Sequence, residues 1–326
     1  MAKIGIMSFA HLHGDFYAGC VVANPDAELT AVWDDNVQRG QDAAQRYGTA
    51  FIEDMDEFLK QGLDGVIITS ENMKHRQMVE KAAEAGLWIL CEKPLSPTVE
   101  DCQAMVDVCK KAGVGLGIPY PCRHVPALKE VKKQIDSGAL GKIFAVSCTN
   151  NGQFPGGWFG DESLSGGGAT MDHTVHVADL LRWYTGKEFT KVYCENGNLL
   201  RSGLGTDDIG VMHMEMEGGI AISHIASWSR VDSFPTWGDV TLEIVAENGV
   251  IEVDAFNQKV DVYNDDDVKA QWVGWGMDPN GGIVADFVAS IAEKRDPIAT
   301  GMDGLKSVAV TVAAYKSART TEMVEV

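Results

Sequence analysis

Several features that would place this chain in other protein classes are missing. Its seven cysteines are an odd number without a C-x-x-C pair, which argues against a disulfide framework or a zinc knuckle. Lys and Arg total 27 against 47 Asp and Glu, without a basic cluster, so no nucleic-acid partner is expected. No apolar run reaches membrane-spanning length, and no secretory leader pattern precedes the first strand. We therefore expect a soluble cytoplasmic protein with reduced thiols and no membrane association.

A complete glycine fingerprint is also missing. A first apolar strand ends near Met7, and the following turn stands where dinucleotide-binding proteins carry G-x-G-x-x-G. Ser8 and Ala10 take the first two glycine positions and are small enough for close backbone approach. His13 takes the third, where it would crowd the packing of helix on strand unless the loop differs. His11 and His13 have no carboxylate or cysteine in view, so no metal site is expected.

The first part of the chain alternates short apolar runs with amphipathic stretches. This alternation predicts a doubly wound parallel α/β sheet in residues 1–120, a Rossmann domain. Helical patterns are expected at residues 36–47, 75–85 and 99–111. Apolar runs, and hence strands, are expected at residues 4–7, 29–33, 65–69, 88–91 and 113–118.

After Pro119 the pattern changes to longer, alternating runs separated by glycine-containing turns. This indicates a second α/β domain, residues 121–326, with a large open sheet that is antiparallel or mixed. Helical periodicity returns near residues 126–137, 283–294 and 304–319, and the last helices could pack back on the first domain. Strands are expected at residues 143–149, 192–196, 209–216, 220–229, 240–246 and 250–254.

Asp34 ends the second predicted strand, a little over twenty residues after the first turn. A carboxylate at this place accepts the hydroxyls of the adenosine ribose. Together with Asp35 it would repel a 2′-phosphate, so NAD is favoured over NADP. The alternative is that Asp34 caps the helix that begins near Asn36.

Lys93 and Pro94 follow a buried apolar strand. Ligands sit at the carboxyl edge of an open parallel sheet, which makes Lys93 a candidate site residue, while Pro94 fixes the backbone beside it. The alternative is a lysine at the end of a strand that simply reaches solvent.

Glycines lead into a helix that begins near residue 169 and carries Asp172 and His176 one turn apart. The spacing places both on one helix face, with Asp179 on nearly the same stripe. An imidazole oriented by a carboxylate is a suitable general base. A surface ion pair on a capped helix is the alternative, and His173 could equally be the ligand-facing residue.

Taken together, these residues resemble the Gfo/Idh/MocA family of sugar and cyclitol oxidoreductases, over nearly the whole chain. Residues 91–94 (CEKP) are similar to the family's E-K-P signature, and residues 168–176 (GATMDHTVH) to its G-x-x-x-D-x-x-x-H helix. Further matches are Asn72 with His75, Arg123 with Pro126, and residues 138–141 and 296–305. The chain departs from the family pattern in its glycine turn, which bears on nucleotide affinity. It also departs at His173, which indicates a distinctive substrate pocket.

The resemblance implies an NAD-dependent dehydrogenase that acts on a secondary hydroxyl of a sugar, anhydrosugar or cyclitol. Lys93 would contact the reacting hydroxyl, His176 would be the acid and base, and Asp172 would orient substrate or histidine. Glu92 would brace the lysine loop, with a cis Lys93–Pro94 bond. The remaining expected cofactor contacts are Ser8, Phe9, Ala10, His11, His13, Asp34, Thr69, Ser70, Asn72 and His75. The remaining expected substrate contacts are Tyr120, Arg123, Trp158 and His173.

The family also implies a homodimer or homotetramer that assembles through the second domain's sheet. Two rival functions stay open: an NAD-dependent glycosidase of the same fold, and a non-catalytic sensor that binds NAD or a sugar. The glycosidase recycles its cofactor, so stoichiometric NADH release separates it from a dehydrogenase.

Overall fold

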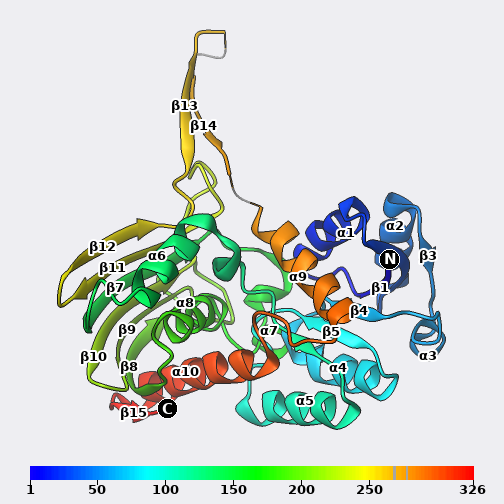
Figure 1. The fold of residues 1–326 in the computed structure, drawn as a ribbon, viewed down its shortest axis with the longest axis horizontal. Coiled ribbons are helices and arrows are strands. Elements are labelled where there is room, and N and C mark those ends of the chain that lie inside the picture. Colours follow the sequence, from blue (N-terminus) through cyan, green and yellow to red (C-terminus); the bar gives the residue numbers. More distant parts are fainter. Residues whose placement is uncertain (267–268, 277) are drawn as a thin grey trace. The chain divides into compact units, whose positions relative to one another are not determined.

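Contacts among the residues divide the computed structural model into two units (Figure 1). Residues 1–266, 269–276 and 278–326 are described. Unit 1 comprises Met1–Pro121, Ser163–Gly166 and Asn280–Val308, and unit 2 comprises Cys122–Glu162, Gly167–Pro279 and Ala309–Val326. The expected division into 1–120 and 121–326 stays a prediction about which segments fold independently.

Unit 1 is built on a six-stranded sheet in the order β3-β2-β1-β4-β5-β6, with every pair parallel. This is the doubly wound order of dinucleotide-binding domains, so the predicted Rossmann fold is confirmed. The strand order reverses between β1 and β4, and ligands bind such sheets beside the carboxyl ends of those strands. The strands are β1 (Ala2–Met7), β2 (Ala27–Trp33), β3 (Ala50–Phe51), β4 (Gly65–Ile68), β5 (Trp88–Cys91) and β6 (Leu116–Gly117).

The helices of unit 1 begin and end at the signals that the sequence carries. The Asn36 side chain caps α2 by accepting from the Arg39 amide, and Gly48 ends it at φ 65°. Asn36 is thus the cap, and the alternative that Asp34 caps this helix is wrong. The helical segments are α1 (His13–Ala23), α2 (Val37–Tyr47), α3 (Met55–Phe58), η1 (Asn72–Lys74), α4 (His75–Glu84), α5 (Val99–Ala112), α7 (Glu162–Ser165), α9 (Pro279–Glu293) and the first part of α10 (Gly301–Thr320).

One core of unit 1 joins the sheet to helices from opposite ends of the chain. Ile4 and Ile67 on the central strands pack with Tyr17 of α1 and with Val284 and Phe287 of α9, all of them essentially buried. The late helix α9 therefore completes the first unit, which Figure 1 shows as orange ribbon beside blue.

Unit 2 contains a seven-stranded sheet in the order β12-β11-β7-β10-β9-β8-β15. The β7 and β10 pair is parallel and the other pairs are antiparallel, which confirms a mixed sheet. Gly218 and Gly219, at φ 80° and 75°, make the tight turn between β9 and β10. The strands are β7 (Ile143–Gly152), β8 (Phe189–Gly197), β9 (Ile209–Met216), β10 (Ile220–Ser227), β11 (Gly238–Ala246), β12 (Gly249–Asp254) and β15 (Val324–Glu325).

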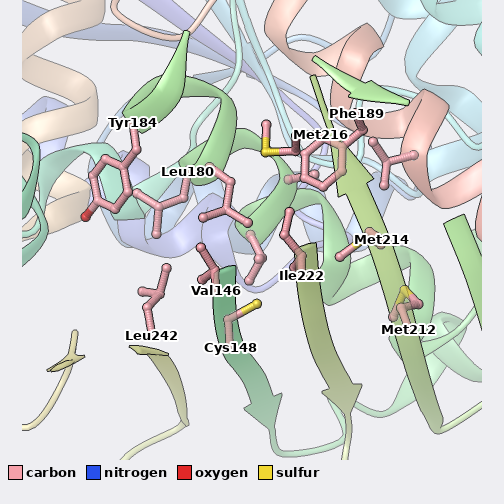
Figure 2. Close-up of a cluster of buried hydrophobic side chains, with 14 of the residues drawn as sticks. Val146, Cys148, Leu180, Tyr184, Phe189, Met212, Met214, Met216, Ile222 and Leu242 are labelled. Carbon is pink, nitrogen blue, oxygen red and sulfur yellow. The ribbon is translucent and has the colours of Figure 1, made fainter. Parts of the chain in front are cut away.

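The core of unit 2 lies between one face of this sheet and the helices α6 (Pro126–Asp136) and α8 (Ala169–Thr185). Figure 2 shows Leu180 and Tyr184 of α8 above Val146, Ile222 and other strand residues. Alternate strand residues point the other way, so the opposite face of the sheet is exposed at Val211, Ile225 and Val245. Among the described helices of the protein, none is long and apolar enough to cross a membrane.

A separate hairpin, β13 (Lys259–Asn264) with β14 (Lys269–Gly274), was not predicted from the sequence. Val260, Val262, Trp272 and Val273 are exposed on it. Its first residues, Lys259 to Val262, alternate polar and apolar side chains, and no side chain of the hairpin whose burial is described is buried.

Candidate functional site

The turn between β1 and α1 lies at the carboxyl edge of the unit 1 sheet and is held by hydrogen bonds within the chain. The Phe9 amide donates to Asp34 Oδ2 at 2.8 Å, and the His11 amide donates to the Thr69 carbonyl at 2.9 Å. Ser8 is buried and has φ 73°, the left-handed backbone that a glycine would adopt at no cost. The Ala10 amide donates to the Ser8 hydroxyl at 3.2 Å.

His13 does not crowd the packing of helix on strand, because Gly14 is the residue at the close approach. A Cβ on Gly14 would lie 2.9 Å from Thr69 Oγ1 and 3.0 Å from Phe9 Cδ1. The close-packing glycine of the fingerprint is thus displaced by one residue. Sequence reasoning missed it because the alignment of Ser8, Ala10 and His13 to the motif fixed the third position at 13.

His13 instead directs its ring to Glu92, at the end of β5. His13 Nδ1 lies 2.8 Å from Glu92 Oε1, and the His13 amide donates to His11 Nδ1 at 3.0 Å. Ligand atoms of His11, His13 and Glu92 all lie within 4.8 Å of one another. The sequence places no carboxylate beside these histidines, and the structure brings one from 79 residues away. The sequence predicts no metal site here, and this stays a prediction.

Glu92 and Lys93 form a buried loop with a cis Lys93–Pro94 bond, as the resemblance implies. Lys93 is only 5% exposed, and its amide donates to Glu92 Oε2 at 3.0 Å. Burial alone would raise the pKa of Glu92, but the charges of His13 and His11 outweigh it and hold that pKa well below its usual range. Glu92 is therefore an anion that fixes both the histidine turn and the lysine backbone.

The residues after β4 are buried, and His75 is tied up by backbone groups. Its Nδ1 lies 3.1 Å from the carbonyls of Pro94 and Leu95, and its Nε2 lies 3.2 Å from the Ser70 carbonyl. His75 therefore braces the lysine loop from behind, where the sequence analysis expected a cofactor contact. Asn72 Nδ2 donates to the Ser165 carbonyl at 2.8 Å, whereas its buried Oδ1 accepts no hydrogen bond from the described residues.

Asp34 directly follows β2, at the predicted place, but its carboxylate already has protein partners. Oδ2 accepts from the Phe9 amide and from Arg39 Nε, both at 2.8 Å. Oδ1 accepts from the Asn36 amide at 2.8 Å and from Arg39 Nη2 at 2.7 Å. Arg39 was not among the predicted site residues, although it lies five positions after Asp34 on the next helix.

Asp35 lies beside this pair and is bound by two cations. Arg39 Nη2 lies 2.9 Å from its Oδ1 and Lys74 Nζ 2.5 Å from its Oδ2, while Lys74 also lies 3.0 Å from Glu71 Oε2. Burial alone would raise the pKa of Asp35, but the hydrogen bond and charge of Lys74 outweigh it and lower the pKa. Both aspartates are thus paired anions.

The edge of the unit 1 sheet has space and donors that fit NAD. A hollow of about 360 Å³ is lined by Phe9, Asn36, Arg39, Arg46 and neighbouring residues, beside the end of β2 where the adenosine half belongs. The unused Oδ1 of Asn72 and the buried Lys93 supply polar groups beside the ends of β4 and β5. The same edge of the sheet also contains Ser8, Phe9, Thr69 and Ser70.

In unit 2, a glycine just before α8 lies very close to the backbone of Asp207. A Cβ on Gly168 would lie 1.8 Å from the Asp207 carbonyl oxygen, so only glycine fits there. The Asp207 carboxylate accepts from the Gly168 amide at 3.1 Å and the Thr170 amide at 2.8 Å, and so binds the helix start. Gly168 thus lies against Asp207, a contact that sequence reasoning did not identify.

Asp172 is held by two side chains within unit 2. Trp228 Nε1 donates to Asp172 Oδ2 at 3.0 Å, and His173 Nε2 lies 3.2 Å from the same oxygen. His173 Nδ1 lies 2.8 Å from the Asn150 carbonyl, so both ring nitrogens of His173 lie close to oxygen atoms. His173 therefore orients Asp172. Trp228 carried no signal in the sequence, because the contact joins residues 56 positions apart.

His176 lies one turn after Asp172 on α8 and is 9% exposed. Asp179, on nearly the same stripe, is fully buried and binds Arg123 through two hydrogen bonds at 2.9 and 2.6 Å. The Arg123 guanidinium also lies 5.9 Å from the centre of the Trp183 ring. Arg123 thus joins α8 to the segment before α6 in a buried ion pair, which differs from the expected substrate contact.

Two aromatic residues complete the predicted set. Tyr120 is 1% exposed in unit 1. Trp158 is partly exposed in unit 2 and stacks on Phe159 with ring centres 4.0 Å apart. Phe154 and Phe159 pack on Trp228, so the group that holds Asp172 is backed by aromatic rings. An apolar wall beside a fixed carboxylate suits a ligand that has both ring faces and hydroxyls.

Comparisons with known proteins match both units to one family. Residues 3–120 match the model described as an oxidoreductase family with an NAD-binding Rossmann fold, and residues 128–252 match the GFO/IDH/MocA C-terminal domain. The scyllo-inositol 2-dehydrogenase (NAD(+)) of Bacillus subtilis is 27% identical, over 98% of this chain and 93% of its own. The 1,5-anhydro-D-fructose reductase of Ensifer adhaerens is 26% identical, over 100% of this chain and 99% of its own.

Solved structures share the fold over the whole chain. GenD2 from gentamicin A biosynthesis, in complex with NAD, has a TM-score of 0.90 at 23% identity over 100% of this chain and 96% of its own. Levoglucosan dehydrogenase, in complex with NADH and levoglucosan, has a TM-score of 0.85 at 23% identity over 100% of this chain and 99% of its own. The cofactor of this chain is NAD, and the chain belongs to the Gfo/Idh/MocA family of NAD-dependent oxidoreductases.

Proposed function

We propose that this chain oxidises a secondary hydroxyl of a sugar, anhydrosugar or cyclitol with NAD. The observation that carries the proposal is the pair Asp172 and His176 on one face of α8, with Asp172 fixed from behind, in a chain whose other unit is an NAD-binding fold. Relatives named for inositol and anhydrofructose support the substrate class.

Each proposed site residue has one role. NAD, when bound, accepts the hydride from the carbon that carries the hydroxyl. His176 removes the hydroxyl proton. The Lys93 ammonium stabilises negative charge that develops during the reaction. Asp172 accepts a hydrogen bond from a neighbouring substrate hydroxyl, in an orientation set by Trp228 and His173. Trp158 offers an apolar face to the substrate ring.

The exposed face of the unit 2 sheet supports assembly into a homodimer or homotetramer. Val211, Ile225 and Val245 are 38–44% exposed there, beside a hollow of about 320 Å³. A second copy of this face would cover these side chains. Sedimentation of the wild type and of Val245→Glu tests this proposal, which requires the variant to sediment as a smaller species.

The thiols support a location in the cytoplasm. Cys91, Cys102, Cys109, Cys122, Cys148 and Cys194 are buried and reduced. Burial raises the pKa of Cys102 and of Cys109 to about 12, so these thiols are unreactive and ordinary core residues. The pattern suits a reducing compartment.

A screen of NADH absorbance against a panel of sugars and cyclitols tests the proposed reaction. A dehydrogenase releases NADH in proportion to substrate consumed. Hydrolysis of a glycoside without net NADH would favour the NAD-dependent glycosidase, and NAD binding without turnover of any polyol would favour the sensor.

A further inference from the structure

Two tryptophans border the segment between β10 and β11, and they differ in exposure. Trp228 directly follows β10, is 1% exposed and donates its Nε1–H to Asp172 Oδ2. Trp237 directly precedes β11 and is 50% exposed. The segment that holds Asp172 therefore carries a second indole, and half of its surface is accessible to a ligand.

Contacts of the backbone and one ion pair fix the position of Trp237. The Gln153 amide donates to the Trp237 carbonyl at 3.0 Å. The Arg230 amide donates to the Gly152 carbonyl at 2.9 Å, and the Arg230 side chain donates from Nε to Asp239 Oδ2 at 2.8 Å. The segment is thus tied to the end of β7 and to the start of β11, so Trp237 stands on a fixed backbone.

The indole of Trp237 lies beside His173, and Gly152 leaves the space for both rings. A Cβ on Gly152 would lie 2.8 Å from His173 Cε1, 3.1 Å from His173 Nε2 and 3.5 Å from Trp237 Nε1. The N–H edge of the indole is therefore the edge that faces this position. His173 Nε2 lies 3.2 Å from Asp172 Oδ2. The Trp237 N–H thus stands one imidazole ring away from the carboxylate that we assign to the substrate.

The N–H of Trp237 is an available donor. Trp228 donates to Asp172, and Trp33 donates to the Glu53 carbonyl, whereas no hydrogen bond among the residues that the structure describes uses Trp237 Nε1. An indole N–H can only donate, and a hydroxyl oxygen can accept as well as donate. A polyol can therefore donate from one hydroxyl to Asp172 and accept with another from Trp237.

We propose that Trp237 is a specificity-determining residue whose Nε1–H donates to a second hydroxyl of the substrate that Asp172 binds. The substrate then carries at least three hydroxyls: the one that reacts, the one that donates to Asp172 and the one that accepts from Trp237. The inference rests on the proposed oxidation of a polyol and narrows its substrate class. Because Trp237 contacts a hydroxyl that does not react, its bond contributes to binding before and during the reaction alike.

Kinetics of the full chain with NAD and the best polyol of the screen test this proposal, together with the Kd of that polyol for the chain loaded with NADH, measured by calorimetric titration. Trp237→Phe keeps an aromatic ring and removes the N–H. We expect the KM and the Kd of the polyol to rise about three- to tenfold, while kcat stays within about twofold of the wild type. The monodeoxy polyol that lacks the accepting hydroxyl should bind the wild type and Trp237→Phe equally well.

Trp275→Phe is the control, because Trp275 is another exposed tryptophan of unit 2. It should leave KM, Kd and kcat within about twofold of the wild type. An unchanged Kd of the polyol in Trp237→Phe overturns the proposal, and a fall in kcat and melting temperature with that Kd unchanged marks a packing residue. A Kd that rises equally for the polyol and for every monodeoxy form also overturns it.

Failure of the proposed function would be seen separately. A wild type that binds polyols without oxidising them refutes the oxidation alone, since the Kd values still test the role of Trp237. A wild type that binds no polyol refutes both.

Discussion

Replacing Trp228 by phenylalanine tests whether the hydrogen bond to Asp172 matters for the reaction. The substitution removes the Nε1–H that lies 3.0 Å from Asp172 Oδ2 and keeps an aromatic ring against Phe154 and Phe159. Asp172 is 6% exposed, so water cannot easily replace the lost donor. We expect an active enzyme in which Asp172 is held from one side only, by His173.

The expected loss of kcat/KM in Trp228→Phe follows from the burial of Asp172. A buried hydrogen bond to a charged group contributes about 1.5–3 kcal/mol, which corresponds to a fall of about 10- to 150-fold in kcat/KM. His173 still contacts the same oxygen at 3.2 Å, which favours the lower part of this range. The loss should fall on substrate use and leave the Kd of NADH unchanged, because Trp228 and Asp172 belong to unit 2.

The assay measures kcat and KM with the best substrate from the polyol screen, the Kd of NADH, and the melting temperature of each variant. Phe159→Leu is the control, since it disturbs the same aromatic group without touching the hydrogen bond. If Trp228→Phe keeps wild-type kcat/KM, or loses no more than Phe159→Leu, Trp228 is a packing residue and does not position Asp172.

Three further predictions concern residues of the two units. Gly14→Ala places a Cβ 2.9 Å from Thr69 Oγ1. Urea unfolding should show that the free energy of unfolding falls by about 1–3 kcal/mol, and NADH should bind more weakly. Gly19→Ala on the same helix is the control, because its Cβ meets no atom within 4 Å, and it should be neutral or stabilising. Burial lowers the pKa of His224 to about 3, below the value of about 6.5 in the unfolded chain. As the pH falls, the unfolded state therefore takes up a proton first, and His224 lowers the free energy of unfolding by about 2 kcal/mol at pH 5 relative to pH 7. The variant His224→Leu should lose correspondingly less stability over that range. An equal loss in both proteins would contradict the buried neutral ring. Glu92→Gln removes the anion beside His13 and Lys93, so NADH titration should show weaker binding; unchanged binding and turnover would mean that Glu92 does not organise the edge.

Much of the fold could be predicted because it depends on local patterns. Apolar runs and glycine turns gave the strand positions, and the alternation of strands and helices in the first part predicted the parallel sheet. Asn36 and Gly48 mark the ends of α2 directly in the sequence. The hairpin β13–β14 was missed although Lys259, Val260, Asp261 and Val262 alternate polar and apolar side chains.

The candidate residues were also found from sequence, but their partners were not. Asp34 was predicted correctly at the end of β2, while its saturation by Arg39 depends on a side-chain geometry that spacing does not specify. The contacts of His13 with Glu92 and of Trp228 with Asp172 join residues 79 and 56 positions apart. Tertiary packing sets such pairs, and a single sequence gives no measure of it.

The central claim is that Lys93 stabilises the negative charge that develops when the substrate hydroxyl is oxidised. Its most direct test is turnover by Lys93→Met with the best polyol, measured by NADH absorbance alongside the Kd of NADH. Removing one fixed donor from a developing oxyanion lowers kcat by about a hundredfold or more, so we expect that loss with NADH binding within about threefold of the wild type. Lys110→Met, at an exposed lysine of the same unit, should show neither effect. Turnover near that of the wild type in Lys93→Met would contradict the account.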